Sequence, residues 1–190
     1  MATAFFITHP EVSVDPALPV PAWRLSDRGV ARMRTFAGSA LLSGLTSIWS
    51  SSEAKAIEAA GLLAAGFGLP VQVDEHLGEN DRTATGFLPP AEFERVADSF
   101  FANPHESVRG WERAVDAQER VARAVFRILG THRDGDIAFI AHGGVGTLLL
   151  CKLLDTTISR SRDQPFQGHF FAFDLPGYKI IHEWRPIAEG

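Results

Sequence analysis

Two histidines, His9 and His142, each follow directly after an apolar run that is typical of a buried strand. The runs cover residues 4–8 and 137–141, and a pair of glycines follows His142. A short strand that delivers a histidine into a turn places the imidazole at the carboxyl edge of a sheet, where α/β proteins bind their ligands. Glycines at such a turn permit close approach of the backbone to a ligand. Together the two segments suggest a two-histidine site, although they lie far apart in the chain.

The remaining pattern must supply a sheet that brings both histidines to one edge. Strands are predicted at 3–8, 48–50, 71–73 and 137–141, and an aromatic hairpin at 169–175 and 178–184. Helices are predicted at 26–43, 54–65, 90–102, 107–130 and 145–154. Strands that alternate with helices predict an α/β fold with a mainly parallel sheet. A long loop is predicted at 76–90, and long loops inside compact domains often have a function.

Composition describes an ordinary globular chain. The 190 residues are 45% hydrophobic and 22% charged, which predicts one domain over residues 1–190. The formal net charge is −5 and the basic residues are scattered, so no nucleic-acid partner is expected. The single cysteine, Cys151, lies in an apolar stretch and is interpreted as a buried small hydrophobe.

Targeting signals are absent from the sequence. The N-terminus lacks the charged start and cleavable apolar segment of a secretory signal, and no apolar run reaches membrane-spanning length. We therefore expect a cytoplasmic protein without a membrane partner. The sequence leaves the oligomeric state open, with a homodimer among the options.

Five short motifs follow one another in a recognisable order. They are Thr8-His9-Pro10-Glu11, Leu25-Ser26-Asp27-Arg28-Gly29, Ser50-Ser51-Ser52-Glu53-Ala54-Lys55-Ala56, Leu77-Gly78-Glu79 and Ala141-His142-Gly143-Gly144-Val145. In this order and spacing the chain resembles the histidine phosphatase superfamily. The resemblance implies a phosphoglycerate-mutase-like fold, which is a three-layer α/β/α sandwich, and a small phosphorylated substrate. It also implies that no metal or other cofactor is needed.

The resemblance assigns roles to individual residues. His9 would attack phosphorus and form a phosphohistidine. His142 and Lys55 would hold the phosphoryl oxygens, together with the backbone at Gly143. Glu79 would protonate the leaving alcohol and then activate water.

Three departures from the family pattern surround His9. Thr8 stands where the family has arginine, Pro10 replaces glycine, and Lys55 replaces a second arginine. Threonine offers one hydroxyl to the phosphate where arginine offers a charged planar fork, a loss of about 1.5–3 kcal/mol, or roughly 10- to 100-fold in rate. An arginine from elsewhere could compensate, and Arg82 is the first candidate, with Arg109 second.

Three hypotheses follow for the function. The first is a metal-independent phosphomonoester hydrolase that acts through His9. The chain is short for the mutase branch, which favours hydrolysis. The second is a catalytically degenerate family member that binds an anionic ligand or a protein partner without turnover, and the third is an unrelated α/β domain with two structural histidines.

Overall fold

The fold is built on one mixed sheet of six strands, in the order β3-β2-β4-β1-β5-β6. The computed structural model describes residues 2–188. The strands are β1 (Ala2–Thr8), β2 (Leu45–Ser50), β3 (Val71–Val73), β4 (Asp136–Ala141), β5 (His169–Leu175) and β6 (Ile180–Pro186). The β3–β2, β2–β4 and β4–β1 pairings are parallel, whereas β5 runs antiparallel to both β1 and β6. The predicted α/β fold with a mainly parallel sheet is confirmed.

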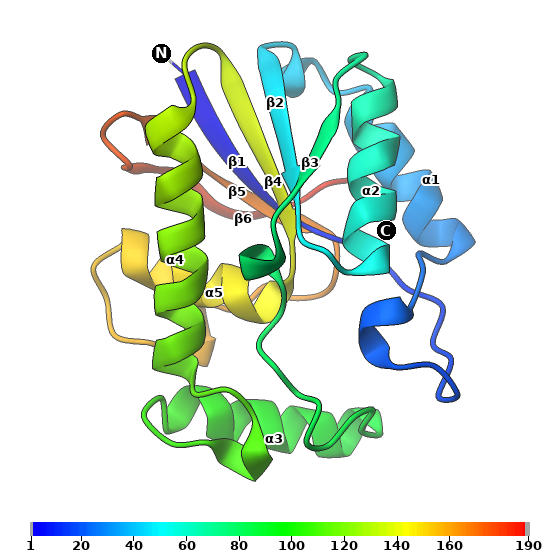
Figure 1. Cartoon of the computed structure of the whole chain (residues 1–190), viewed down its shortest axis with the longest axis vertical. Coiled ribbons are helices and arrows are strands. Elements are labelled where there is room, and N and C mark those ends of the chain that lie inside the picture. The colour runs from blue at the N-terminus through cyan, green and yellow to red at the C-terminus, as the bar shows by residue number, and fades with distance from the viewer. Residues whose placement is uncertain (1, 189–190) are drawn as a thin grey trace.

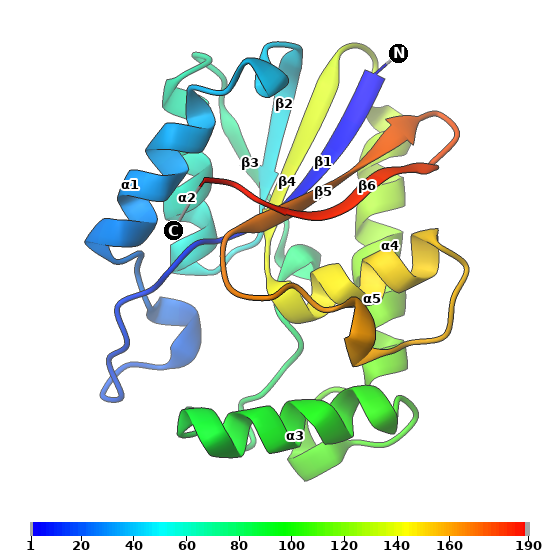
Figure 2. The ribbon, with the colours of Figure 1, turned by 180° about the vertical axis from the view of Figure 1, so that it is seen from behind.

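Helices cover both faces of this sheet. They are α1 (Asp27–Ala37), α2 (Ala54–Ala65), α3 (Pro90–Ala102), α4 (Ala114–Thr131) and α5 (Gly143–Leu153). Figures 1 and 2 show α1 and α2 on one face, and α4 and α5 on the other. Two buried apolar clusters correspond to these two faces. The three-layer α/β/α sandwich is therefore confirmed, with α3 lying beyond the carboxyl ends of the parallel strands (Figure 1).

Two helices are shorter than the sequence predicts. α1 starts as expected, because the Ser26 side chain accepts a hydrogen bond from the backbone of Gly29, but it ends at Ala37 rather than near residue 43. Gly38 follows as its C-cap, and glycine commonly ends helices. α4 begins at Ala114 rather than 107, since Arg109 has a left-handed backbone (φ 55°) that no α-helix accommodates.

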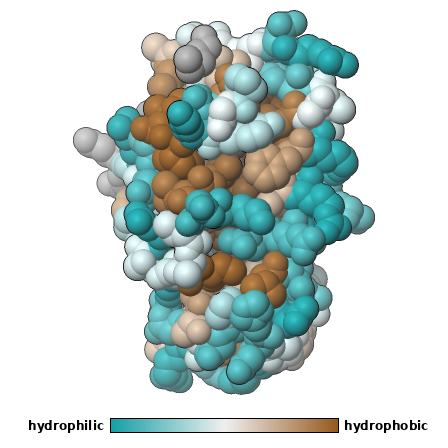
Figure 3. Space-filling model, turned by 90° about the vertical axis from the view of Figure 1, so that its left-hand side faces the viewer, coloured by the Kyte–Doolittle hydropathy of each residue, from teal (hydrophilic) through white to brown (hydrophobic). Residues whose placement is uncertain are grey.

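The hairpin packs its aromatic residues into the core. Phe170, Phe171 and Phe173 are buried, as expected, whereas Phe166 in the preceding loop is half exposed. Figure 3 views the side of the molecule where α4 and the hairpin lie and shows an apolar area bordered by hydrophilic side chains. Among residues 2–188 no helix is both long and apolar enough to cross a membrane.

Strand pairing places the two histidines together. β1 lies beside β4 in parallel, with Thr8 in register with Ala141, so both strands end at the same level. The ladder continues one step further, because the backbone N–H of His9 donates to the carbonyl of Ala141 at 3.1 Å. Two residues that are 133 positions apart in sequence therefore leave the sheet side by side.

Candidate active site

The rings of His9 and His142 face one another at the carboxyl edge of the sheet. Their centroids are 5.2 Å apart and their planes are inclined at 67°. Both side chains are nearly closed off from solvent, with 9% of His9 and 1% of His142 exposed. This separation brings both imidazoles within hydrogen-bond reach of a single bound group.

His9 has a defined tautomer. Its Nδ1 lies 2.9 Å from the carbonyl oxygen of Pro10, which can only accept a hydrogen bond. Nδ1 therefore carries the hydrogen and Nε2 carries the lone pair. Burial, together with the positive charge of Lys55 and the nearby His142, lowers the pKa of His9 to about 3. The imidazole is thus neutral at physiological pH, which is the form that can act as a nucleophile.

His142 is held by the segment that follows β2. Its Nε2 lies 2.7 Å from Ser51 Oγ and 3.3 Å from Glu53 Oε1. Burial lowers the pKa of His142, although the carboxylates of Glu53 and Glu79 oppose this shift. Its other nitrogen, Nδ1, is buried and has no hydrogen-bond partner among the described residues. A buried donor or acceptor without a partner is costly, so this atom is available for a ligand.

Lys55 enters the site as half of a buried ion pair. Its Nζ lies 2.5 Å from Glu53 Oε2 and also donates to the carbonyl of Val20 at 2.9 Å. Burial alone would raise the pKa of Glu53, but His142 and Lys55 outweigh it and lower this pKa to about 2. The positive charge expected for phosphate is therefore present but already balanced by Glu53.

Glu79 sits on the N-terminus of α5. Its carboxylate accepts hydrogen bonds from the backbone N–H groups of Gly144 and Val145 at 3.0 and 2.9 Å. Burial would raise the pKa of Glu79, but Arg82, His142 and the Gly144 N–H together hold it below its usual value. A negative charge is stabilised at this end of a helix, so Glu79 is a carboxylate when no ligand is bound.

Arg82 lies beside Glu79, whereas Arg109 does not approach the site. One Arg82 Nη is 3.3 Å from Glu79 Oε2, and its Nε donates to Asn80 Oδ1 at 2.9 Å. The guanidinium also packs against the neighbouring rings of Phe93 and Trp111, each centroid lying 4.9 Å from Cζ. These contacts fix its orientation.

Arg109 lies in the loop after α3. It is half exposed and pairs with Glu92 of that helix. Of the two arginines named from the sequence, only Arg82 therefore has geometry that fits the site.

The loop that carries Glu79 is fastened to α4 by Arg120. This guanidinium donates to the carbonyl oxygens of His76, Gly78 and Glu79 and pairs with the carboxylate of Glu112. It lines a surface hollow of about 880 Å³ between α4 and the end of β3.

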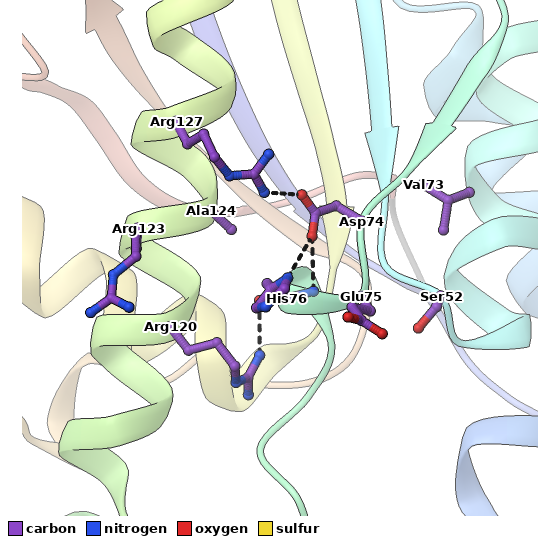
Figure 4. A pocket seen from close by; sticks show the side chains of 9 residues that line it. All are labelled: Ser52, Val73, Asp74, Glu75, His76, Arg120, Arg123, Ala124 and Arg127. Atoms are coloured by element: carbon purple, nitrogen blue, oxygen red, sulfur yellow. Dashed lines mark hydrogen bonds and ion pairs between the residues drawn. The ribbon is translucent and has the colours of Figure 1, made fainter.

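Figure 4 shows Arg120, Arg123 and Arg127 along one side of this hollow. Arg127 pairs with Asp74 across it, and Arg123 pairs with the exposed Glu119 on its own helix. Arg120 at this hollow therefore holds the Glu79 loop against α4, and all three arginines are paired with acidic side chains.

Thr8 is buried and its hydroxyl is occupied by protein groups. Oγ1 lies 2.7 Å from Gln164 Oε1 and accepts a hydrogen bond from the backbone of His169 at 3.0 Å. Gly143 lies close to the same glutamine, since a Cβ added at Gly143 would be 2.4 Å from Gln164 Nε2. Thr8 and Gly143 thus both lie at the site, with Gln164 between them.

Glu11, which follows the His9 motif, has a structural explanation. Its carboxylate pairs with Arg32 and Arg28 of α1. Arg32 is buried and also donates to the carbonyls of Gln167 and Gly168. Glu11 therefore ties the turn after His9 to the loop before β5.

Four residues of this site carried no role in the sequence argument: Ser51, Glu53, Arg120 and Gln164. Ser51 and Glu53 belong to the segment that resembles the family motif. The acidic residue two positions before Lys55 is the feature of the sequence that could have indicated the ion pair. Arg120 and Gln164 lie in a helix and a loop where nothing in the sequence distinguishes them from surface residues.

A comparison with protein families identifies the chain. The profile of the histidine phosphatase superfamily (branch 1) matches residues 20–169. The chain belongs to this superfamily. The matched region contains Lys55, Glu79 and His142 but starts after His9, where the Thr8 and Pro10 departures lie. A search of curated protein sequences gave no significant match.

Solved structures of the superfamily share the fold. Bacillus stearothermophilus YhfR has a TM-score of 0.81 at 21% identity, covering 96% of this chain and 95% of that one. A mycobacterial glucosyl-3-phosphoglycerate phosphatase in complex with inorganic phosphate has a TM-score of 0.77 at 19% identity, covering 97% and 95%. A phosphoserine phosphatase from Entamoeba histolytica in complex with 3-phosphoglyceric acid has a TM-score of 0.77 at 13% identity, covering 97% of each chain.

Proposed function

We propose that this histidine phosphatase superfamily member hydrolyses a phosphomonoester through a phosphohistidine on His9. The observation that carries the proposal is the neutral His9 ring, which its Nδ1 hydrogen bond holds with the lone pair on Nε2. The centroid of this ring lies 5.2 Å from that of His142. A nucleophile with its hydrogen on Nδ1 needs no base to remove a proton before it attacks phosphorus.

The first half-reaction transfers the phosphoryl group to His9. The N–P bond forms at Nε2 as the ester P–O bond breaks, and the electron pair leaves with the alcohol oxygen. His142 Nδ1, which has no protein partner among the described residues, would donate to a phosphoryl oxygen when it carries a hydrogen, either in the imidazolium or in the neutral tautomer whose Nε2 accepts the Ser51 hydroxyl. Glu79 takes up a proton from solvent when the substrate binds and then supplies it to the leaving oxygen. The approaching phosphate raises the pKa of this carboxyl, because like charges disfavour the ionised form.

The second half-reaction returns His9 to its starting state. Glu79, now a carboxylate again, removes a proton from water, and the water oxygen attacks phosphorus as the N–P bond breaks. Inorganic phosphate and the neutral imidazole result. The low pKa of Glu79 in the absence of ligand suits this base role.

One observation supports the second candidate, anion binding without turnover. Both imidazoles are neutral, and the positive charges of Lys55 and Arg82 are balanced by the negative charges of Glu53 and Glu79. A pocket with no net charge stabilises a phosphoryl transition state less than a pocket with free arginines does. This arrangement favours slow turnover or binding alone.

The test compares the wild-type chain with His9→Asn. Asparagine keeps a side-chain N–H for the Pro10 carbonyl but has no nucleophilic nitrogen, and the exposed His105→Ala serves as the control. Both are assayed with an aryl phosphate between about pH 4 and 8 in the presence of a chelator. We expect turnover in the wild type and the control, none in His9→Asn, and an acid-labile phosphoryl label that only His9→Asn lacks. Equal, negligible rates of hydrolysis in all three proteins would contradict the proposed hydrolysis and favour anion binding without turnover.

A further inference from the structure

The amide group of Gln164 has a fixed orientation at the end of β1. The Thr8 hydroxyl accepts the backbone hydrogen of His169 and donates to Gln164 Oε1 at 2.7 Å, which is nearer than its other acceptor, the His169 carbonyl at 3.2 Å. An amide whose oxygen is held on one side presents both hydrogens of its nitrogen on the other. Thr8 therefore determines where Gln164 Nε2 points.

Gln164 Nε2 lies against Gly143, at the start of α5. It is so close to Gly143 that a Cβ there would be 2.4 Å from it. Thr8 directly precedes His9 and Gly143 directly follows His142, so the amide spans the gap between the two strand ends. Within residues 2–188 Nε2 makes no hydrogen bond to a protein acceptor. Two donor hydrogens are thus left over at the edge of the proposed phosphate pocket.

The segment that carries Gln164 is held by its own turn and by contacts with α5 and β6. Its backbone N–H donates to Asp163 Oδ1 at 2.8 Å, and the same oxygen accepts the Thr147 hydroxyl of α5 at 2.8 Å. Two residues earlier, the carbonyl of Arg162 accepts the indole N–H of Trp184 from β6 at 2.8 Å. A donor held by this many contacts loses little entropy when it binds a ligand.

We propose that Gln164 binds a phosphoryl oxygen of the substrate through Nε2, and that Thr8 is the residue that positions it. This inference rests on the proposed phosphate site. It gives the hydrogen-bond donor that takes the place of an arginine before His9. The amide contributes a neutral hydrogen bond where a guanidinium would contribute a charged, bidentate one. The site should therefore discriminate less sharply between singly and doubly charged phosphates.

The main experiment measures the dissociation constant of inorganic phosphate by calorimetry on the full chain. Gln164→Glu keeps the shape of the side chain but replaces the donor by a negative charge. Gln167→Glu makes the same charge change three residues away in the same loop, where the exposed side chain has no hydrogen-bond partner among residues 2–188. We expect Gln164→Glu to weaken phosphate binding at least about 10-fold. We expect Gln167→Glu to change it less than about 2-fold.

A double-mutant cycle tests the positioning role of Thr8. Thr8→Val removes the hydroxyl, and we expect it to weaken phosphate binding roughly 3- to 10-fold in the parent chain. In a Gln164→Leu background the same change should have almost no further effect, because Thr8 acts only through the amide. Melting temperatures of all variants show whether each is folded, and Thr8→Ser, which keeps the hydroxyl, should bind phosphate as the wild type does.

The outcomes separate this inference from the proposed reaction. Equal phosphate affinity in Gln164→Glu and Gln167→Glu would overturn the role of Gln164, even if the chain hydrolyses esters. Absence of phosphate binding by the wild-type chain would overturn it as well. Loss of phosphate binding in Gln164→Glu alone supports the role of Gln164. This holds even if the wild type binds phosphate but does not hydrolyse an aryl phosphate.

Discussion

Glu53 and Lys55 form an ion pair of 2.5 Å at the start of α2, with only 12% and 5% of their side chains exposed. Removing one member leaves the other charge buried and unpaired. We expect Lys55→Met to lower the free energy of unfolding by about 3–5 kcal/mol, measured by urea denaturation. The double variant Lys55→Met/Glu53→Leu should recover most of this loss, and a cost below about 1 kcal/mol for the single change would contradict the pair's importance.

The same pair limits the charge available to a phosphate. Glu53→Gln keeps the size of the side chain and removes one negative charge, which leaves Lys55 uncompensated beside His142. We expect the affinity for inorganic phosphate to increase about 3- to 10-fold at low ionic strength, since an unpaired cation attracts the anion. Calorimetric titration measures the effect. Glu58→Gln on α2 provides a matched control, and weaker binding in Glu53→Gln would refute the argument.

Stability should fall in acid through His9 and Glu53. Unfolded His9 binds a proton below its ordinary pKa of 6.5, whereas in the folded protein the pKa is about 3, so stability is lost as the pH falls from 6.5 towards 3. Glu53, lowered from 4.5 to about 2, adds a loss between those values. Melting temperatures recorded from about pH 7 to 4 should therefore decline less steeply in His9→Asn than in the wild type. Parallel curves would show that His9 does not titrate in this way.

Arg120 should matter for both stability and turnover. Arg120→Gln removes charge-assisted hydrogen bonds to the carbonyls of His76, Gly78 and Glu79, and we expect a loss of about 2–3 kcal/mol in unfolding free energy. Because Glu79 is then held less firmly, kcat should fall about 10- to 100-fold with little change in KM.

Arg123→Gln is the matched control for Arg120. Arg123 lies one turn away on the same helix and has only a surface pair, so its replacement should cost less than about 0.5 kcal/mol. Similar losses for both arginines would rule out the clamp.

Two glycines in helices should respond to alanine with opposite signs. A Cβ at Gly29 in α1 would lie 2.2 Å from the carbonyl oxygen of Glu11, a backbone atom that cannot move aside cheaply. We expect Gly29→Ala to destabilise the fold by about 1–3 kcal/mol. Gly61 in α2 has no atom within 4 Å of such a Cβ, so Gly61→Ala should stabilise by about 0.5–1 kcal/mol. Thermal denaturation of the two variants decides between the signs.

The sheet and the meeting of the two histidines were predictable from sequence because they depend on local patterns. Apolar runs define β1 and β4, and neighbouring parallel strands deliver the residues after their carboxyl ends, here His9 and His142, to one edge. The early end of α1 was missed, since the apolar pattern continues past Gly38 into a separate 3-10 turn at Ala40–Leu42. The late start of α4 was missed because nothing in the sequence marks the left-handed Arg109.

The hydrogen-bond partners within the site could not be predicted in the same way. Lys55 was expected to face a phosphate, but Glu53 two residues earlier folds back onto it, and both orientations are compatible with the same sequence. Gln164 reaches the site only because its loop crosses from α5 to β5 over the ends of two other strands. Such contacts depend on tertiary packing, whereas motif spacing reports only where the strands end.

The central place of β1 has a consequence for the timing of the reaction. β1 is hydrogen-bonded to β4 on one side and to β5 on the other, so the backbone that carries His9 opens only when the whole sheet opens. Glu79, in contrast, lies in a loop without regular structure, and side-chain contacts and the N-terminus of α5 hold it in place. Amide hydrogens of β1 should thus exchange with solvent among the slowest in the chain, and those around Glu79 much faster. The proposed nucleophile directly follows the most persistent element of the fold, and the proposed proton donor belongs to a loop that can be released and recaptured in each cycle.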